Sequence, residues 1–154
     1  QAIMLVCKSY SVFEVTYFWG VGGSIPAMLT PDLNHGFPSF EFLGFFVGHT
    51  LVVISLLFAI AAYGYRPSLG SVARTVIITT LYMGLVAVVN AMLDSNYLYL
   101  SAKPEGISIY DYLGPWPWYI VSISFIGLLV TLMCYAPFAR VWRQRQANSK
   151  QAKP

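Results

Sequence analysis

Charge is scarce in this chain. Of its 154 residues only 10% are Asp, Glu, Lys or Arg, whereas 57% are hydrophobic and 16% are aromatic. Because roughly a quarter of the residues in soluble domains are charged, a soluble domain of this length would lack a solvated surface. The composition therefore excludes an ordinary soluble protein and favours a membrane protein.

Cysteine and histidine are also rare, with two residues of each. Cys7 and Cys134 form no CxxC pair, and no His/Cys cluster has the spacing of metal ligands. The glycines near residue 20 lack the spacing and the flanking strand of a nucleotide-binding loop. We therefore expect neither a disulfide framework, nor a metal site, nor a cofactor.

Long apolar runs dominate what is present. Residues 12–29, 42–63, 72–93 and 118–138 can each cross a hydrocarbon core, which takes about 20 helical residues. They predict an all-α fold, a polytopic transmembrane helical bundle over residues 1–143 with four full spans. A disordered cytoplasmic tail is expected over residues 144–154.

The first residues predict a helix stump. Residues 2–6 are apolar but too short to span, and they lack the charged region of a signal peptide. The chain starts with Gln1 instead of Met, so we interpret it as an N-terminally truncated fragment. The missing upstream helices would then be packing partners of the bundle.

The distribution of Lys and Arg predicts the orientation. Basic residues precede the first span, surround the turn between the second and third, and follow the fourth: Lys8, Arg66, Arg74, Arg140, Arg143, Arg145, Lys150 and Lys153. The two other loops contain only Lys103. By the positive-inside rule the basic segments are cytoplasmic, and we expect a multi-pass plasma-membrane protein. Topology accounts for the basic residues, so membrane lipids are expected as partners and nucleic acid is not.

Polar groups inside spans are costly and mark candidate sites. His49 lies about 12 Å into the second span, by the helical rise of about 1.5 Å per residue. Its imidazole can serve as acid, base or ligand near neutral pH, or it can be a structural histidine bonded to a neighbouring helix. Asn90 lies near the outer end of the third span. It can face the same chamber in the outer half of the membrane as His49, or it can hydrogen-bond two helices together.

The carboxylates predict different roles. Glu14, one turn into the first span, enters the membrane at the depth of Arg66 and Arg74, and we predict an ion pair with one of them. Asp32 and Asp111 lie just outside the membrane. They are candidates for orienting a histidine, or they cap and shape their loops.

A catalytic Cys–His pair within the chain is not expected, because such a pair must come within hydrogen-bond reach. Cys7 and Cys134 belong to the cytoplasmic ends of their segments, whereas His49 belongs to the outer half of its span. A nucleophile for His49 would have to come from elsewhere.

Several short runs between residues 11 and 138 carry a family resemblance. They are Tyr17-Phe18-Trp19-Gly20, Leu29-Thr30-Pro31-Asp32-Leu33, Phe45-Phe46 with Gly48-His49, Arg66-Pro67, Asn96-Tyr97, Lys103-Pro104 and Leu113-Gly114-Pro115-Trp116-Pro117-Trp118-Tyr119. The last run is the most specific. Together they resemble the YwaF-like bacterial integral membrane proteins, a family of uncharacterised function that is distantly similar to the eukaryotic transmembrane protein 164 group.

This resemblance implies an activity for the intact protein. The eukaryotic relatives are regarded as phospholipid acyltransferases that use a Cys and a His, and His49 matches the position of their histidine. Their cysteine would precede this chain. The first hypothesis is therefore a lipid acyltransferase or hydrolase with His49 as catalytic base. The second is a non-enzymatic protein that binds or transports a small molecule in a cavity lined by His49, Asn90 and the glycines of the first span.

Overall fold

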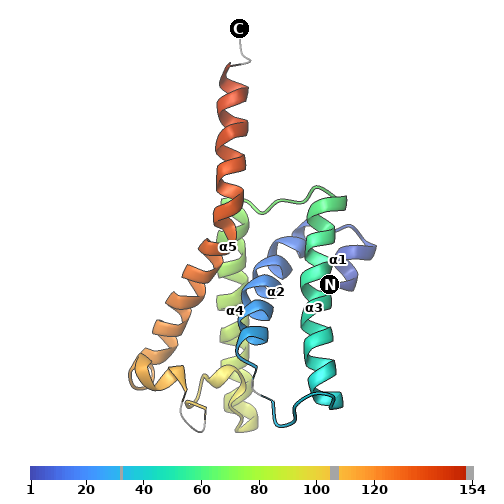
Figure 1. The fold of residues 1–154 in the computed structure, drawn as a ribbon. Helices are drawn as coiled ribbons and strands as arrows, with labels where there is room; N and C mark the ends of the chain where they lie inside the picture. Colours follow the sequence, from blue (N-terminus) through green and yellow to red (C-terminus); the bar gives the residue numbers. More distant parts are fainter. Residues whose placement is uncertain (32, 105–107, 152–154) are drawn as a thin grey trace. The chain divides into compact units, whose positions relative to one another are not determined.

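The computed structural model describes residues 1–31, 33–104 and 108–151, with side chains described as far as Arg140. Within these residues the chain is helical and contains no strand (Figure 1). The elements are α1 (Ala2–Val6), α2 (Tyr10–Leu29), α3 (Phe40–Ala62), α4 (Leu69–Leu93), two short 3₁₀ turns η1 (Tyr97–Tyr99) and η2 (Ile109–Leu113), and α5 (Trp118–Gln151). The predicted all-α fold is confirmed.

The helices agree with membrane spanning. Among the described residues, three segments are long and apolar enough to cross a bilayer: Phe40–Ala62, Leu69–Leu93 and Trp118–Arg140. Helix α2 has 20 residues, which is sufficient length, but it is not among these three segments and it carries Glu14 and several glycines and tyrosines. Crossing by α2 therefore stays a prediction, and α1 occupies the predicted helix stump.

Serine side chains set two of the helix starts. The Ser9 hydroxyl accepts a hydrogen bond from the Val12 amide at 3.4 Å, and the Ser39 hydroxyl accepts one from the Phe42 amide at 3.1 Å. Because the first turn of a helix leaves its amides unpaired, such caps favour a start at that residue. The sequence therefore begins α2 and α3 two residues ahead of the predicted spans.

The end of α5 differs from the prediction. The helix continues to Gln151, where the sequence predicted a disordered tail from residue 144. The run of Arg, Gln and Ala in this part has a high helix propensity, and this propensity favours a helix although the segment is polar. Residues 152–154 of the predicted tail lie outside the described residues.

The sequence predicted one helical domain, and the structure groups the chain into two compact units. Unit 1 comprises residues 1–75 and 131–154, and unit 2 comprises residues 76–130. Unit 1 thus holds α1, α2, α3, the start of α4 and the second half of α5, and unit 2 holds the rest of α4, both 3₁₀ turns and the first half of α5.

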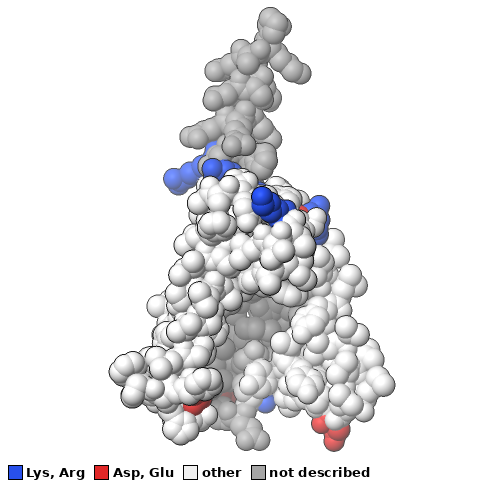
Figure 2. All heavy atoms as spheres, turned by 90° about the vertical axis from the view of Figure 1, so that its right-hand side faces the viewer, with Lys and Arg blue, Asp and Glu red and all other residues white. Residues whose placement is uncertain are grey.

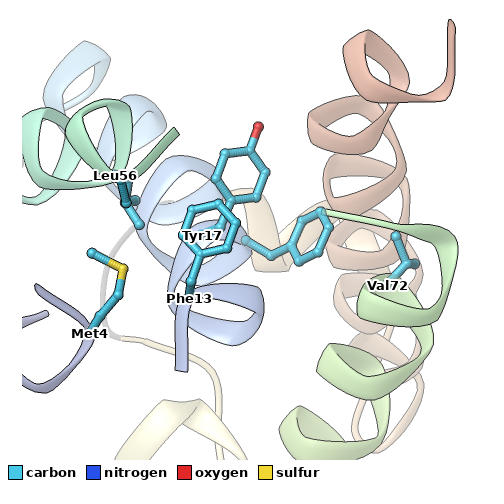
Figure 3. Close-up of a cluster of buried hydrophobic side chains, with 7 residues drawn as sticks. Met4, Phe13, Tyr17, Leu56 and Val72 are labelled. Carbon is cyan, nitrogen blue, oxygen red and sulfur yellow. The ribbon is translucent and has the colours of Figure 1, made fainter. Parts of the chain in front are cut away.

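The core of unit 1 is built on α2. Its buried hydrophobic residues are Met4, Phe13, Tyr17, Phe18, Leu56, Ala59 and Val72. Figure 3 shows the rings of Phe13 and Tyr17 between Leu56 and Met4 on one side and Val72 on the other. In a membrane such side chains hold helices together by close van der Waals packing, and the first half of α2 supplies three of these seven residues.

A glycine lets α2 and α3 approach closely. A Cβ atom at Gly20 would lie 2.6 Å from Leu56 Cδ1 and 2.9 Å from Val52 Cγ1, whereas one at Gly23 would meet nothing within 4 Å. The space at Gly20 is therefore filled by α3. Gly20 therefore takes part in helix packing, and its space is not the cavity that the second hypothesis assigned to the glycines of the first span.

Candidate functional site

His49 lies on α3, on the stripe that packs against α2. It precedes Val52 by three residues and Leu56 by seven, and residues at these spacings share one side of a helix. The side chain is partly buried. Its Nδ1 lies 2.8 Å from the Phe45 carbonyl oxygen, and its ring centroid lies 4.3 Å from that of Phe45. Among the described residues its recorded contacts are thus to its own helix.

The Glu14 side chain, unlike that of His49, is fully buried and contacts another helix. Its side chain is only 2% exposed. Oε1 accepts a hydrogen bond from the Ser71 hydroxyl at 2.5 Å, and Oε2 accepts one from Arg74 Nη1 in an ion pair. The Thr75 hydroxyl donates to the Glu14 backbone carbonyl at 3.4 Å. Both carboxylate oxygens are therefore partnered by the first turns of α4, whose N-terminal dipole also favours a negative charge.

The hydrogen bonds to Glu14 have a fixed direction. An ionised carboxylate only accepts, so Ser71 Oγ donates its single hydrogen to Glu14. The contact of 3.0 Å between the Ser68 and Ser71 hydroxyls then requires Ser68 to donate. Ser71 Oγ also accepts from the Ser68 amide at 2.9 Å, and Ser68 Oγ accepts from the Ser71 amide at 3.2 Å. This reciprocal cap of α4 is joined directly to the buried carboxylate.

Arg66, the alternative partner predicted for Glu14, has a different environment. Its backbone carbonyl accepts a hydrogen bond from the Tyr10 hydroxyl at 2.8 Å, and the described contacts of Glu14 do not include its guanidinium. The four described basic side chains of unit 1 are Lys8, Arg66, Arg74 and Arg140. Figure 2 shows Lys and Arg atoms gathered at the end of this unit where α3 ends and α4 begins. Glu14 is thus partnered at the basic end.

Asn90 closes the turn after α4 in unit 2. Its Oδ1 accepts hydrogen bonds from the Ser95 hydroxyl at 3.1 Å and the Tyr97 amide at 2.9 Å, and its Nδ2 donates to the Tyr97 carbonyl at 3.0 Å. A side chain engaged at both ends by its own loop has little capacity left for a ligand. The arrangement therefore gives no support to the binding role predicted for Asn90.

Asp111 and Asp32 are the two loop aspartates for which the sequence predicts either a histidine-orienting role or a role in their own loops. Asp111 accepts a hydrogen bond from the Ser108 amide at 2.9 Å and lies 3.9 Å from Lys103 Nζ. These contacts belong to a loop cap, the alternative weighed for it. Asp32 lies outside the described residues.

Tyrosines occupy the same loops of unit 2. The Tyr110 ring packs edge-on against Tyr119 and tilted against Tyr99. Burial raises the pKa of the Tyr110 phenol, and Tyr99 adds to the shift. The phenol is therefore neutral at physiological pH and serves as a packing group.

The two cysteines are free. Cys7 is exposed, and the backbone carbonyl of Cys134 accepts a hydrogen bond from the buried Tyr17 hydroxyl at 3.0 Å. Neither is in recorded contact with His49 within the described residues. No cluster of three or more His, Cys, Asp and Glu side chains suited to a metal occurs there either.

Three contributors to these sites were missing from the sequence prediction. Ser71 and Ser68 complete the Glu14 network, and their Ser-x-x-Ser spacing at the start of an apolar run was a readable capping signal. Phe45 contacts His49 one helical turn away. Its i to i+4 spacing was visible in the sequence.

The comparisons with known proteins agree with this membrane architecture. A search of curated proteins and a search of solved structures each gave no match. A family model, described as the TMEM164 family, matches residues 1–135. That match covers α1 to α4 and about the first half of α5, including the segments that carry Glu14 and His49. The chain is a membrane protein that belongs to the TMEM164 family.

Proposed function

We propose that the intact protein transfers or hydrolyses acyl chains of membrane lipids, with His49 as general base for a cysteine supplied from outside these 154 residues. The observation that supports it most is the environment of His49. An ionisable ring lies within an apolar helix, partly buried and bonded to that helix at one nitrogen only. Such a group is costly to place in a membrane, so its presence usually indicates a function.

The chemistry assigned to His49 is proton transfer. The imidazole accepts the thiol proton, and the thiolate attacks the ester carbonyl of a phospholipid. A thioester forms as the ester C–O bond breaks, and the departing lysolipid alkoxide takes the proton back from the imidazolium. A lysophospholipid hydroxyl or water then attacks the thioester, and its proton passes through His49 to the thiol. The family resemblance of the Gly48-His49 segment supports this assignment. It also supports our proposal that the chain belongs to the YwaF-like bacterial branch.

Substitution of His49 in the intact open reading frame tests the function. Membranes that contain the protein are supplied with a phospholipid whose acyl chain is isotope-labelled and with an unlabelled lysophospholipid, and labelled products are measured by mass spectrometry. We expect His49→Ala to lower transfer or release by about 10²- to 10⁴-fold, the usual contribution of a general base. His35→Ala is the matched control, because His35 is the other histidine and lies exposed beside Glu41. Unchanged activity in His49→Ala contradicts the function.

For the orientation, we propose that the protein resides in the plasma membrane with its C-terminus in the cytoplasm. The distribution of Lys and Arg around the apolar helices supports this arrangement. In a background in which every other cysteine is replaced, Cys7 and Cys134 included, we expect an impermeant maleimide added to intact cells to label Ala102→Cys and to leave Ser149→Cys unlabelled until the membrane is permeabilised. Ala102 is suitable because its side chain is exposed. The reversed labelling pattern contradicts this orientation.

A further inference from the structure

The hydrogen bond between His49 and Phe45 determines where the imidazole carries its proton. Nδ1 lies 2.8 Å from the Phe45 carbonyl oxygen. A carbonyl oxygen only accepts hydrogen bonds, so Nδ1 must be the donor. In a neutral imidazole with a hydrogen on Nδ1, the lone pair that accepts a proton belongs to Nε2.

The Phe45 ring holds the imidazole in this orientation. The two ring centroids lie 4.3 Å apart with a tilt of 40° between the ring planes. Phe45 is itself held by Phe46 at 5.3 Å, and Phe46 lies 4.5 Å from Phe42. Turning the imidazole to exchange Nδ1 and Nε2 would break the hydrogen bond and displace the ring from this row of aromatic side chains.

We propose that His49 is fixed in its Nδ1–H tautomer, that Nε2 is therefore its basic atom, and that Phe45 is the positioning residue that fixes it. Phe45 does so twice, with its backbone oxygen as acceptor and with its ring as a side wall. Among the described residues no recorded hydrogen bond engages Nε2, so this nitrogen is available to an incoming proton donor. The catalytic meaning of Phe45 rests on the proposed function, whereas the tautomer does not.

Nitrogen-15 spectroscopy of the histidines tests the tautomer directly. The chain has only two histidines, so a histidine-labelled sample of the full chain in detergent micelles gives two rings, assigned with His35→Asn. At mildly alkaline pH we expect Nδ1 of His49 to show the shift of a protonated nitrogen and Nε2 that of an unprotonated one. The opposite assignment, or averaged shifts for both nitrogens, overturns the proposal.

Substitution of Phe45 tests the positioning role. We expect Phe45→Ala to give averaged nitrogen shifts at His49, because the imidazole can then rotate, and Phe45→Tyr to restore the single tautomer by restoring the ring. Phe58→Ala is the matched control on the same helix, since the recorded ring contact of Phe58 is to Tyr63. An unchanged His49 spectrum in Phe45→Ala overturns the positioning role.

Activity separates this inference from the proposed function. If the intact protein transfers acyl chains, Phe45→Ala should lower kcat by up to about 10²-fold, the cost of a misplaced catalytic group, with KM nearly unchanged. Loss of the single tautomer together with unchanged kcat overturns the catalytic role of Phe45. A fixed tautomer in a protein whose His49→Ala variant remains fully active contradicts the proposed function and leaves the tautomer assignment intact.

Discussion

Glu14 and His49 are two of the ionisable side chains on the long helices of unit 1, and their environments are opposite. Glu14 on α2 is 2% exposed and has a partner at each carboxylate oxygen. His49 on α3 is partly buried and is bonded through Nδ1 to the carbonyl of its own helix. Glu14 joins two helices, whereas the contacts of His49 with the described part of the chain stay within α3.

The difference shows how to separate structural from chemical candidates inside a membrane protein. A buried carboxylate with a partner at each oxygen is closed to a substrate by its burial, and removing a partner leaves its charge uncompensated. A group with one nitrogen engaged and the other free keeps its acid–base capacity. By this criterion Glu14 stabilises the bundle, and His49 remains the candidate for chemistry.

The largest expected effect comes from removing the partner of Glu14. Arg74→Gln leaves a buried carboxylate without its counter-ion, and we expect the free energy of unfolding in detergent to fall by about 3 kcal/mol, the lower end for a broken buried pair, because Arg74 is 53% exposed. The double variant Glu14→Gln/Arg74→Gln removes both charges and should recover part of the loss. Losses that simply add, when the double variant is compared with Glu14→Gln and Arg74→Gln alone, would show that the charges do not act as a pair.

A smaller effect is expected where α2 meets α3. Gly20→Ala forces Leu56 and Val52 to move, and overpacking of this kind costs about 1–3 kcal/mol. Gly23→Ala meets open space within 4 Å and should gain up to about 1 kcal/mol from helix propensity. The two variants should therefore shift thermal unfolding in opposite directions. Equal shifts would mean that the close approach at Gly20 does not stabilise unit 1.

The smallest effect on stability is expected at His49. His49→Ala removes a hydrogen bond to a carbonyl that is already part of the helix, so we expect the free energy of unfolding to change by no more than about 1 kcal/mol. Denaturant unfolding of this variant beside Arg74→Gln measures the contrast between the two sites. A loss at His49 as large as that at Arg74 would assign the histidine a structural role.

The helices were predictable and the choice of hydrogen-bond partners was not. The apolar runs predicted the starts of α2 and α3 to within two residues, because a membrane span needs a long apolar run. The serine caps set the observed starts. Depth alone left Arg66 and Arg74 equivalent as partners of Glu14. The helical phase of α4 decides between them, since Ser71, Arg74 and Thr75 share one face.

Asn90 shows a second limit of the sequence. Its amide was expected to face a chamber or a neighbouring helix, and it instead bonds Ser95 and Tyr97 of the following turn. Asn side chains compete for nearby backbone groups, and the path of a turn is not encoded in hydropathy. For Glu14 the sequence left fewer possible partners than for Asn90, because a carboxylate in an apolar helix requires a counter-ion.

The network at Glu14 also bears on the order of biosynthesis. A ribosome completes α2 before it makes the two partners of Glu14: the Ser71 hydroxyl, which donates a hydrogen bond, follows 57 residues later, and the counter-ion Arg74 follows 60 residues later. Helix α2 is also not among the three segments that are long and apolar enough to qualify as spans. If α2 crosses the membrane as the sequence predicts, its unpaired carboxylate disfavours transfer from the translocon into lipid during synthesis. We then expect stable insertion of α2 to await α4, so that the two helices would integrate together.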